Sequence, residues 1–76
     1  MKRVKLDNIT YNALDKICDI LHFDWFYHDY YSRKTIDVCD VENIYNECQV
    51  SPDARVDIKN LPICVINLFV KCNLIK

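Results

Sequence analysis

The spacing of apolar residues changes along the first part of the chain. Residues 2–6, KRVKL, alternate basic and apolar side chains as a short edge strand does. Residues 8–22 have helical spacing instead, since their apolar residues recur every three or four positions. The residues on that apolar face are Tyr11, Leu14, Ile17, Cys18 and Leu21. The candidates for the N-cap are Asp7, Asn8 and Thr10. The pattern predicts a strand followed by an amphipathic helix.

The next segment, residues 23–31, reads FDWFYHDYY and fits two kinds of element. Its rings recur at alternate positions, as in a strand, and also four positions apart, as on one face of a helix. The aromatic density favours a strand. Residues 32–34 have the composition of a turn. Residues 35–40, TIDVCD, predict a second strand with Ile36 and Val38 on one face.

The second half of the chain begins with a predicted short helix capped by Asp40. The apolar residues that give it helical spacing are Val41, Ile44, Tyr45 and Cys48. Ser-Pro-Asp at 51–53 breaks this pattern. After the break, Val56 and Ile58 indicate a short strand.

The C-terminal stretch again fits two elements. A helix capped by Asn60, with Pro62 in its first turn, would bury one apolar stripe. That stripe consists of Leu61, Val65, Leu68, Phe69 and Cys72. A strand is the alternative, because apolar residues also alternate from Cys64 to Cys72 and many are β-branched. We favour the helix.

The order of these elements indicates the fold class. Strand, helix, strand, strand, helix, strand and a last helix predict an α+β domain with a small, mostly antiparallel sheet and two or three helices. A ferredoxin-like βαββαβ arrangement is the simplest way to connect them. At 76 residues the chain has the length of one domain, so we assign residues 1–76 to a single domain.

Composition excludes several classes of protein. Hydrophobic residues make up 51% of the chain and charged residues 28%, which is the balance of a globular protein and not of a disordered one. The net charge of -1 provides no overall basic field for nucleic acid. Glycine is absent. Gly-rich phosphate loops, nucleophile elbows and dinucleotide-binding turns in their usual form are therefore excluded, and Asn and Asp are expected at left-handed turn positions.

Several features predict a cytoplasmic location. The N-terminus lacks the apolar core of a secretion signal. The longest apolar stretch, 61–75, is short for a membrane span and contains Asn67, Lys71 and Asn73, so we expect no membrane association. The cysteine count of five is odd, which favours reduced thiols over a disulfide framework.

Candidate chemical groups are few. Cys18 and His22 lie four residues apart on the first predicted helix, where an imidazole could activate a thiol. Cys18 also belongs to the apolar face, so an inert buried thiol is the favoured interpretation. Cys18 and His22 could instead supply two zinc ligands, with the others from His28, Cys39 or Cys48, but no two cysteines have the close spacing of a structural zinc site. Asp15, Asp19, Asp24 and Asp29 have the distribution of solvated surface carboxylates. We predict no enzyme, no cofactor and no metal.

The aromatic segment is the most distinctive feature. In a strand its rings would point to both faces, and only one face can enter the core. The other would form an aromatic surface with a charged edge, as at protein-binding sites. The predicted binding residues are Trp25, Phe26, Tyr27, Tyr30, Tyr31, Arg33 and Lys34. The alternative that the rings form only the core stays open.

These observations predict a small intracellular protein-interaction module, whose partner is another protein or a second copy of the chain. The chain is small, and its many Asn, Ile, Lys, Asp and Tyr residues are typical of proteins encoded by AT-rich genomes. Both features fit a viral or phage effector that occludes or recruits a host protein. A module that stacks single-stranded nucleic acid on its rings is the first alternative, weakened by Asp24 and Asp29. A small zinc-stabilised domain is the second.

Overall fold

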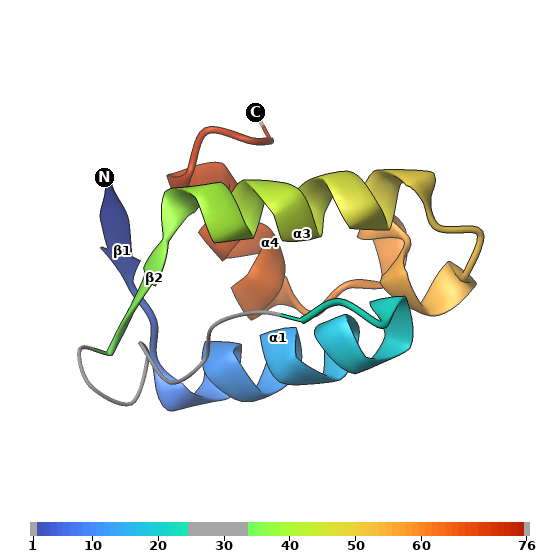
Figure 1. Cartoon of the computed structure of the whole chain (residues 1–76), viewed down its shortest axis with the longest axis horizontal. Helices are drawn as coiled ribbons and strands as arrows, with labels where there is room; N and C mark the ends of the chain where they lie inside the picture. The colour runs from blue at the N-terminus through green and yellow to red at the C-terminus, as the bar shows by residue number, and fades with distance from the viewer. Residues whose placement is uncertain (1, 25–33, 76) are drawn as a thin grey trace.

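The computed structural model describes residues 2–24 and 34–75 (Figure 1). This part of the chain is mainly helical, with a small antiparallel sheet, and it confirms the predicted α+β class. Its elements are β1 Arg3–Lys5, α1 Asn8–Leu21, β2 Thr35–Asp37, α3 Val38–Val50, the 3-10 helices η1 Ala54–Val56 and η2 Ile58–Asn60, and α4 Ile63–Lys71.

The sheet joins the N-terminus to the middle of the chain. β1 and β2 are antiparallel, with Val4 opposite Ile36. Backbone hydrogen bonds extend the ladder at both ends, from the N–H of Leu6 to the carbonyl of Lys34 (3.1 Å) and from the N–H of Val38 to the carbonyl of Lys2 (3.0 Å). The edge strand predicted at the N-terminus is confirmed. The described sheet has two strands, and the ferredoxin-like arrangement is not confirmed.

The predicted boundary between the second strand and the next helix is wrong by about one turn. Residues 38–40 belong to α3 and not to the strand, and Asp37, not Asp40, is the N-cap. The Asp37 carboxylate accepts a hydrogen bond from the N–H of Cys39 at 2.8 Å, which satisfies one of the free donors at the helix start. A local side-chain bond thus overrides the strand propensity of Val38.

The segment after α3 also differs from the prediction. Val56 and Ile58 lie in the 3-10 helices η1 and η2 and not in a strand. Asp53 and Asp57 explain the difference, because each carboxylate accepts the backbone N–H of the residue two positions later, Arg55 (2.9 Å) and Lys59 (3.1 Å). Such bonds favour tight turns over an extended chain.

The C-terminal stretch is helical, as favoured from the sequence. Val65, Leu68 and Phe69 are the buried residues of α4. Pro62 occupies the N-cap position, whereas Asn60, the predicted cap, uses its side-chain Nδ2 to donate to the carbonyl of Ala54 at 2.8 Å. Among the described residues, every helix is too short or too polar to cross a membrane.

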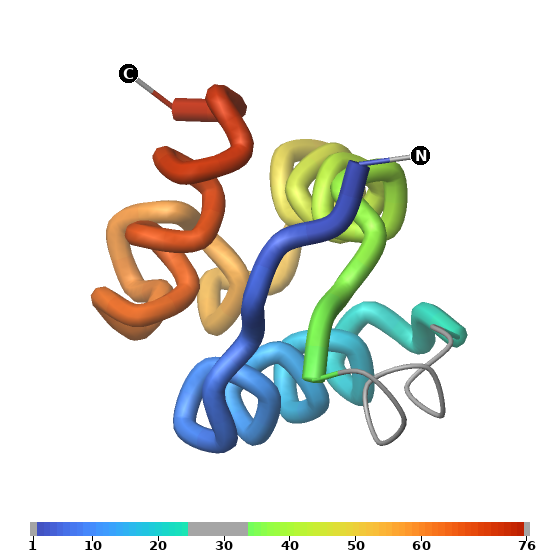
Figure 2. The backbone as a smooth tube through the Cα atoms, turned by 90° about the vertical axis from the view of Figure 1, so that its left-hand side faces the viewer, coloured from blue at the N-terminus to red at the C-terminus, as the bar shows by residue number. Residues whose placement is uncertain are grey.

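The core lies where the three helices meet. Figure 1 shows α3 above, α1 below and α4 crossing behind them, and Figure 2 shows the two strands running between α1 and α3. Each helix contributes a fully buried side chain, Leu14 from α1, Ile44 from α3 and Phe69 from α4. The helical face predicted from Tyr11 to Leu21 therefore packs inward as expected, with Leu21 partly buried at its end.

Without glycine, other residues adopt the left-handed conformation. His22 (φ 55°) ends α1, Lys34 (φ 55°) precedes β2, and Asn73 (φ 61°) follows α4. The next residue, Phe23, donates its N–H to the carbonyl of Cys18 at 2.9 Å, so the helix ends in a Schellman motif. The expectation of Asn at such positions is confirmed at one of these three, while His and Lys occupy the others.

Candidate functional site

The aromatic surface predicted from the sequence falls mostly outside the described residues. The predicted binding residues that lie outside the described part of the chain are Trp25, Phe26, Tyr27, Tyr30, Tyr31 and Arg33. Lys34 belongs to the described part of the chain and is exposed. It lies just before β2, where its carbonyl accepts a hydrogen bond from the N–H of Leu6. The aromatic binding surface stays a prediction.

The structure separates the candidate pair Cys18 and His22. α1 ends at Leu21, and His22 takes a left-handed conformation that turns the chain away from the helical path. Cys18 is buried, whereas His22 is exposed. Burial, followed by the negative charge of Asp15, raises the pKa of the Cys18 thiol to about 12, so the thiol is protonated at neutral pH.

The described residues do not form a metal site. Within residues 2–24 and 34–75, no three His, Cys, Asp or Glu side chains gather where an ion could bind. All five cysteines belong to this part of the chain and are free, with Cys18 and Cys48 buried and Cys39 exposed. Asp19 and Asp24 are exposed, as predicted, and Asp15 is half-buried, while Asp29 and His28 lie outside the described residues.

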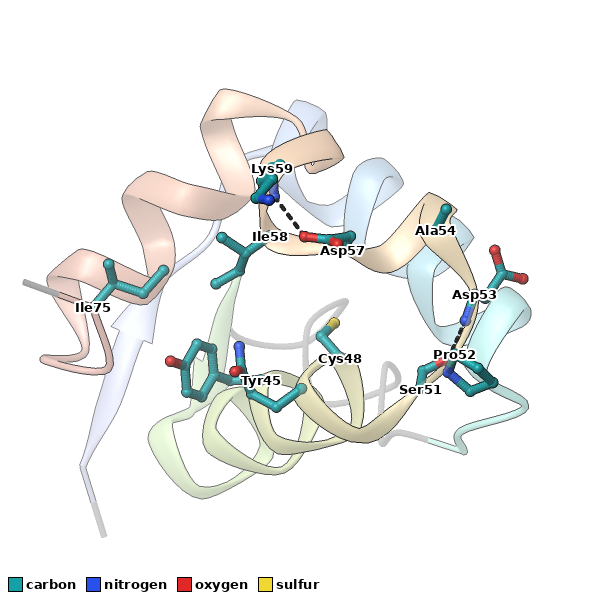
Figure 3. Close-up of a pocket in the computed structure, with 11 residues that line it drawn as sticks. Tyr45, Cys48, Ser51, Pro52, Asp53, Ala54, Asp57, Ile58, Lys59 and Ile75 are labelled. Carbon is teal, nitrogen blue, oxygen red and sulfur yellow. Dashed lines mark hydrogen bonds between the residues drawn. The ribbon is translucent and has the colours of Figure 1, made fainter.

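One hollow opens between α3, the two 3-10 helices and the C-terminal residues (Figure 3). This α3 pocket has a volume of about 590 Å³. The residues that line it are Tyr45, Cys48, Gln49, Ser51, Pro52, Asp53, Ala54, Asp57, Ile58, Lys59 and Ile75. In Figure 3, Tyr45, Ile58 and Ile75 form its apolar end.

The two carboxylates of the α3 pocket are already engaged in the fold. Asp53 and Asp57 hold the first N–H groups of η1 and η2, and Asp53 also forms an ion pair with Arg55 at 2.6 Å. That pair lowers the pKa of the Asp53 carboxyl to about 2. Burial raises the pKa of the Cys48 thiol to about 11. These groups therefore stabilise the turns, and we do not assign a reaction to this pocket.

A second hollow lies along α1, facing η1, η2 and the start of α4. This α1 groove has a volume of about 440 Å³. The residues that line it are Ile9, Asn12, Ala13, Lys16, Ile17, Ile20, Arg55, Asn60 and Pro62. Ile17 is buried, Ala13 and Ile20 are half-buried, and Ile9 is 75% exposed at one end. Ile63, the residue after Pro62, is 71% exposed but is not one of the lining residues.

The groove exists because α1 has two apolar stripes. The predicted stripe from Tyr11 to Leu21 packs into the core. Ile9, Ala13 and Ile20 are spaced by four and seven residues and so form a second stripe beside the first. Of this second stripe, Ile9 is exposed, while Ala13 and Ile20 are half-buried and pack against the edge of the core.

The charges at the groove are basic. Lys16 and Arg55 are its charged lining residues within the described part of the chain. Arg55 donates from Nη2 to Oδ2 of Asp53 at 2.6 Å, and from Nε to the same carboxylate, so much of its charge is neutralised. Lys16 is exposed and has no hydrogen-bond or ion-pair partner among the described residues.

Sequence reasoning missed the residues of the α1 groove. It assigned the inward stripe of α1 and left Ile9, Ala13 and Ile20 without a role. The signal was their helical spacing outside the core stripe, since a helix that is apolar on more than one side has a second packing surface to cover. The place of Asn60 and Pro62 in the groove could not be predicted from residue spacing, because it depends on how η2 packs against α1.

Comparisons of this chain with protein-family models, with curated proteins and with solved structures find no match.

Proposed function

We propose that this protein is a small, non-enzymatic protein-interaction module and that the α1 groove is a contact surface. The observation that carries the proposal is the second apolar stripe of α1, which ends in the 75% exposed side chain of Ile9. Single exposed apolar residues are ordinary on protein surfaces. Ile9, however, is continuous with the half-buried Ala13 and Ile20 along the groove, and a continuous apolar patch of this kind is typical of a binding surface.

The extent of the apolar surface favours a macromolecule over a small ligand. The groove volume of about 440 Å³ is within the range of small-ligand pockets. However, Ile9 lines one end of the groove and is 75% exposed. A small ligand inside the groove would leave much of that side chain in water, whereas a protein could cover the groove and Ile9 together.

Charge favours a protein over nucleic acid. Binding of nucleic acid depends on several unpaired basic groups that displace counterions. Lys16 supplies one such group at the groove, and Arg55 is paired with Asp53. The nucleic-acid alternative therefore depends on the aromatic segment alone. Strong salt dependence of single-strand binding would favour that alternative.

The cytoplasm is the compartment we propose. Support comes from the cysteines, since Cys18 and Cys48 are buried as free thiols in separate helices, and such thiols persist in a reducing environment. The sequence predicts a small effector, of the kind that viruses and phages encode, that occludes or recruits another protein. A contact groove on one helix is compatible with that action.

The test compares variants of the whole chain in capturing proteins from cells of its natural source. Ile9→Asp places a charge at an exposed position of the groove, so the fold should persist while the contact is lost. Because Ile9 lies at one end of the groove, loss of its contact should cost about 1 kcal/mol or more, or at least about fivefold in affinity. The matched control is Val50→Asp, since Val50 is 76% exposed and does not line the groove.

The proposal requires a partner that wild type and the Val50→Asp variant retain and that the Ile9→Asp variant loses. Circular dichroism and melting temperature must show that all three proteins are folded. Equal retention by all three would reject the α1 groove as the contact surface. Alanine variants of the rings from Trp25 to Tyr31 in the same assay test the aromatic surface predicted from the sequence, where at least one ring should be needed for binding and not for folding.

A further inference from the structure

We infer that the α1 groove binds an amphipathic helix of about three turns that places a carboxylate against Lys16. This inference rests on the proposed function and specifies the chemistry of the partner. It follows from the length of the apolar stripe, from the elements that form the walls of the groove, and from the sign of its charge.

The length of the groove matches a short helix. Ile9 and Ile20 are eleven residues apart on α1, which at 1.5 Å per residue is roughly 16 Å, or three helical turns. A partner helix lying along α1 would place an apolar side chain over the groove at each turn. This pattern of apolar anchors at i, i+3 or i+4, and i+7 is the usual one when a helix occupies a groove.

The walls of the groove disfavour an extended peptide. Its lining residues belong to α1, η1, η2 and the residue before α4, and the strands β1 and β2 contribute none. An extended peptide gains most of its affinity by adding to a sheet edge through backbone hydrogen bonds. The α1 groove has no such edge, whereas a helix satisfies its own backbone and needs only side-chain contacts.

The charge of the groove specifies an acidic partner and disfavours a second copy. Lys16 stands on the apolar stripe between Ala13 and Ile20 without a partner in the described part of the chain. Asp15 and Asp19 belong to the same helix but do not line the groove. A second copy of the groove would offer Lys16 no carboxylate, because the lining residues include no Asp or Glu. A Glu or Asp on the partner helix would instead pair with Lys16.

The experiment is a selection from a displayed library of amphipathic helical peptides, randomised at charged and apolar positions, using the purified 76-residue chain as bait. The expected binders have a three-turn apolar stripe and Glu or Asp beside it. Lys16→Glu should reverse the preference to Lys or Arg, and Lys16→Ala should weaken the acidic binders at least about tenfold. Lys59→Glu is the control with the same change of charge outside the groove, and it should have no effect.

The outcomes separate this inference from the proposed function. Selected peptides that are basic or non-helical would overturn the inference. If the Ile9→Asp variant no longer binds those peptides, the groove is kept as a contact surface. Acidic helical binders that are indifferent to both Lys16 variants would also overturn it. If no peptide is selected, the inference fails, and the capture experiment with Ile9→Asp decides the proposed function independently. Each variant must keep the melting temperature of wild type within a few degrees, and Lys16→Ala covers the case in which Lys16→Glu does not fold.

Discussion

The ring of Tyr45 on α3 meets the ring of Phe69 on α4 edge to face, with centroids 5.2 Å apart and planes inclined at 74°. Phe69 is fully buried, while Tyr45 is half-buried and also lines the α3 pocket. The edge-to-face arrangement is favourable because the positive edge of one ring meets the negative face of the other. This contact packs α3 against α4.

Phe69→Ala should destabilise the protein strongly. Removal of a fully buried ring leaves a cavity and costs about 3–5 kcal/mol, a large part of the total stability of a small domain. Urea unfolding would measure the loss. Tyr45→Phe keeps the second ring and should change stability little. A loss below about 1 kcal/mol for Phe69→Ala would contradict the packing of α4 against α3.

Asp37→Ala should destabilise the start of α3. The carboxylate of Asp37 is the acceptor for the N–H of Cys39 at 2.8 Å, and loss of such a cap costs about 1 kcal/mol. Asp37→Asn retains an acceptor oxygen and should recover most of the stability. Thermal unfolding of the three proteins checks this. Equal stability of the Ala and Asn variants would mean that the cap contributes nothing.

His22→Gly should stabilise the protein. His22 has a φ of 55°, a conformation that costs a residue with a Cβ roughly 1 kcal/mol more than it costs glycine. Because glycine also gains freedom in the unfolded chain, the net gain is expected to be at most about 1 kcal/mol. His22→Val is the matched contrast and should lower the melting temperature, since a β-branched residue tolerates this conformation poorly.

The ion pair of Asp53 with Arg55 should make stability fall in acid. Hydrogen bonds from Arg55 hold the pKa of the folded Asp53 at about 2, below its ordinary value of 3.8. A carboxyl with a lowered folded pKa stabilises the fold above 3.8 and loses that contribution as the pH falls toward 2. The difference in melting temperature between wild type and Asp53→Asn should therefore shrink across this range. Salt should reduce the difference at neutral pH, because the pair is exposed.

The thiols should differ in their rates of alkylation. Burial raises the pKa of Cys18 to about 12 and that of Cys48 to about 11, so both are protonated and shielded at mildly alkaline pH. Mass spectrometry after a short iodoacetamide pulse should find these two unmodified in the folded protein, with the exposed Cys39 modified before them. In denaturant all five cysteines should react. Early modification of Cys18 would contradict its place in the core, and fewer than five thiols would contradict the reduced state.

The sequence by itself determined the elements whose signals are local. The core stripe of α1 and the edge strand at Arg3–Lys5 follow from spacing within a few residues, and Asp7, the N-cap in the structure, was one of three candidates. The α+β class follows from the order of those elements. At the C-terminal stretch, periodicity favoured a helix but also allowed a strand, and the helix that forms there buries Val65, Leu68 and Phe69 in the core.

Competition between local interactions decided where the chain turns, and tertiary structure decided which apolar residues remain outside the core. The position of Asp37 at the start of α3 and the tight turns at Asp53 and Asp57 depend on single hydrogen bonds that compete with strand propensity, and residue spacing does not rank such competitors. The α1 groove depends on more distant packing still. Ile9, Ala13 and Ile20 have helical spacing like the core residues, and the placement of η2 and Pro62 beside α1 makes them one wall of a groove, with Ile9 exposed and the other two half-buried. A stripe of residues is local, but what covers it is set by parts of the chain far away in sequence.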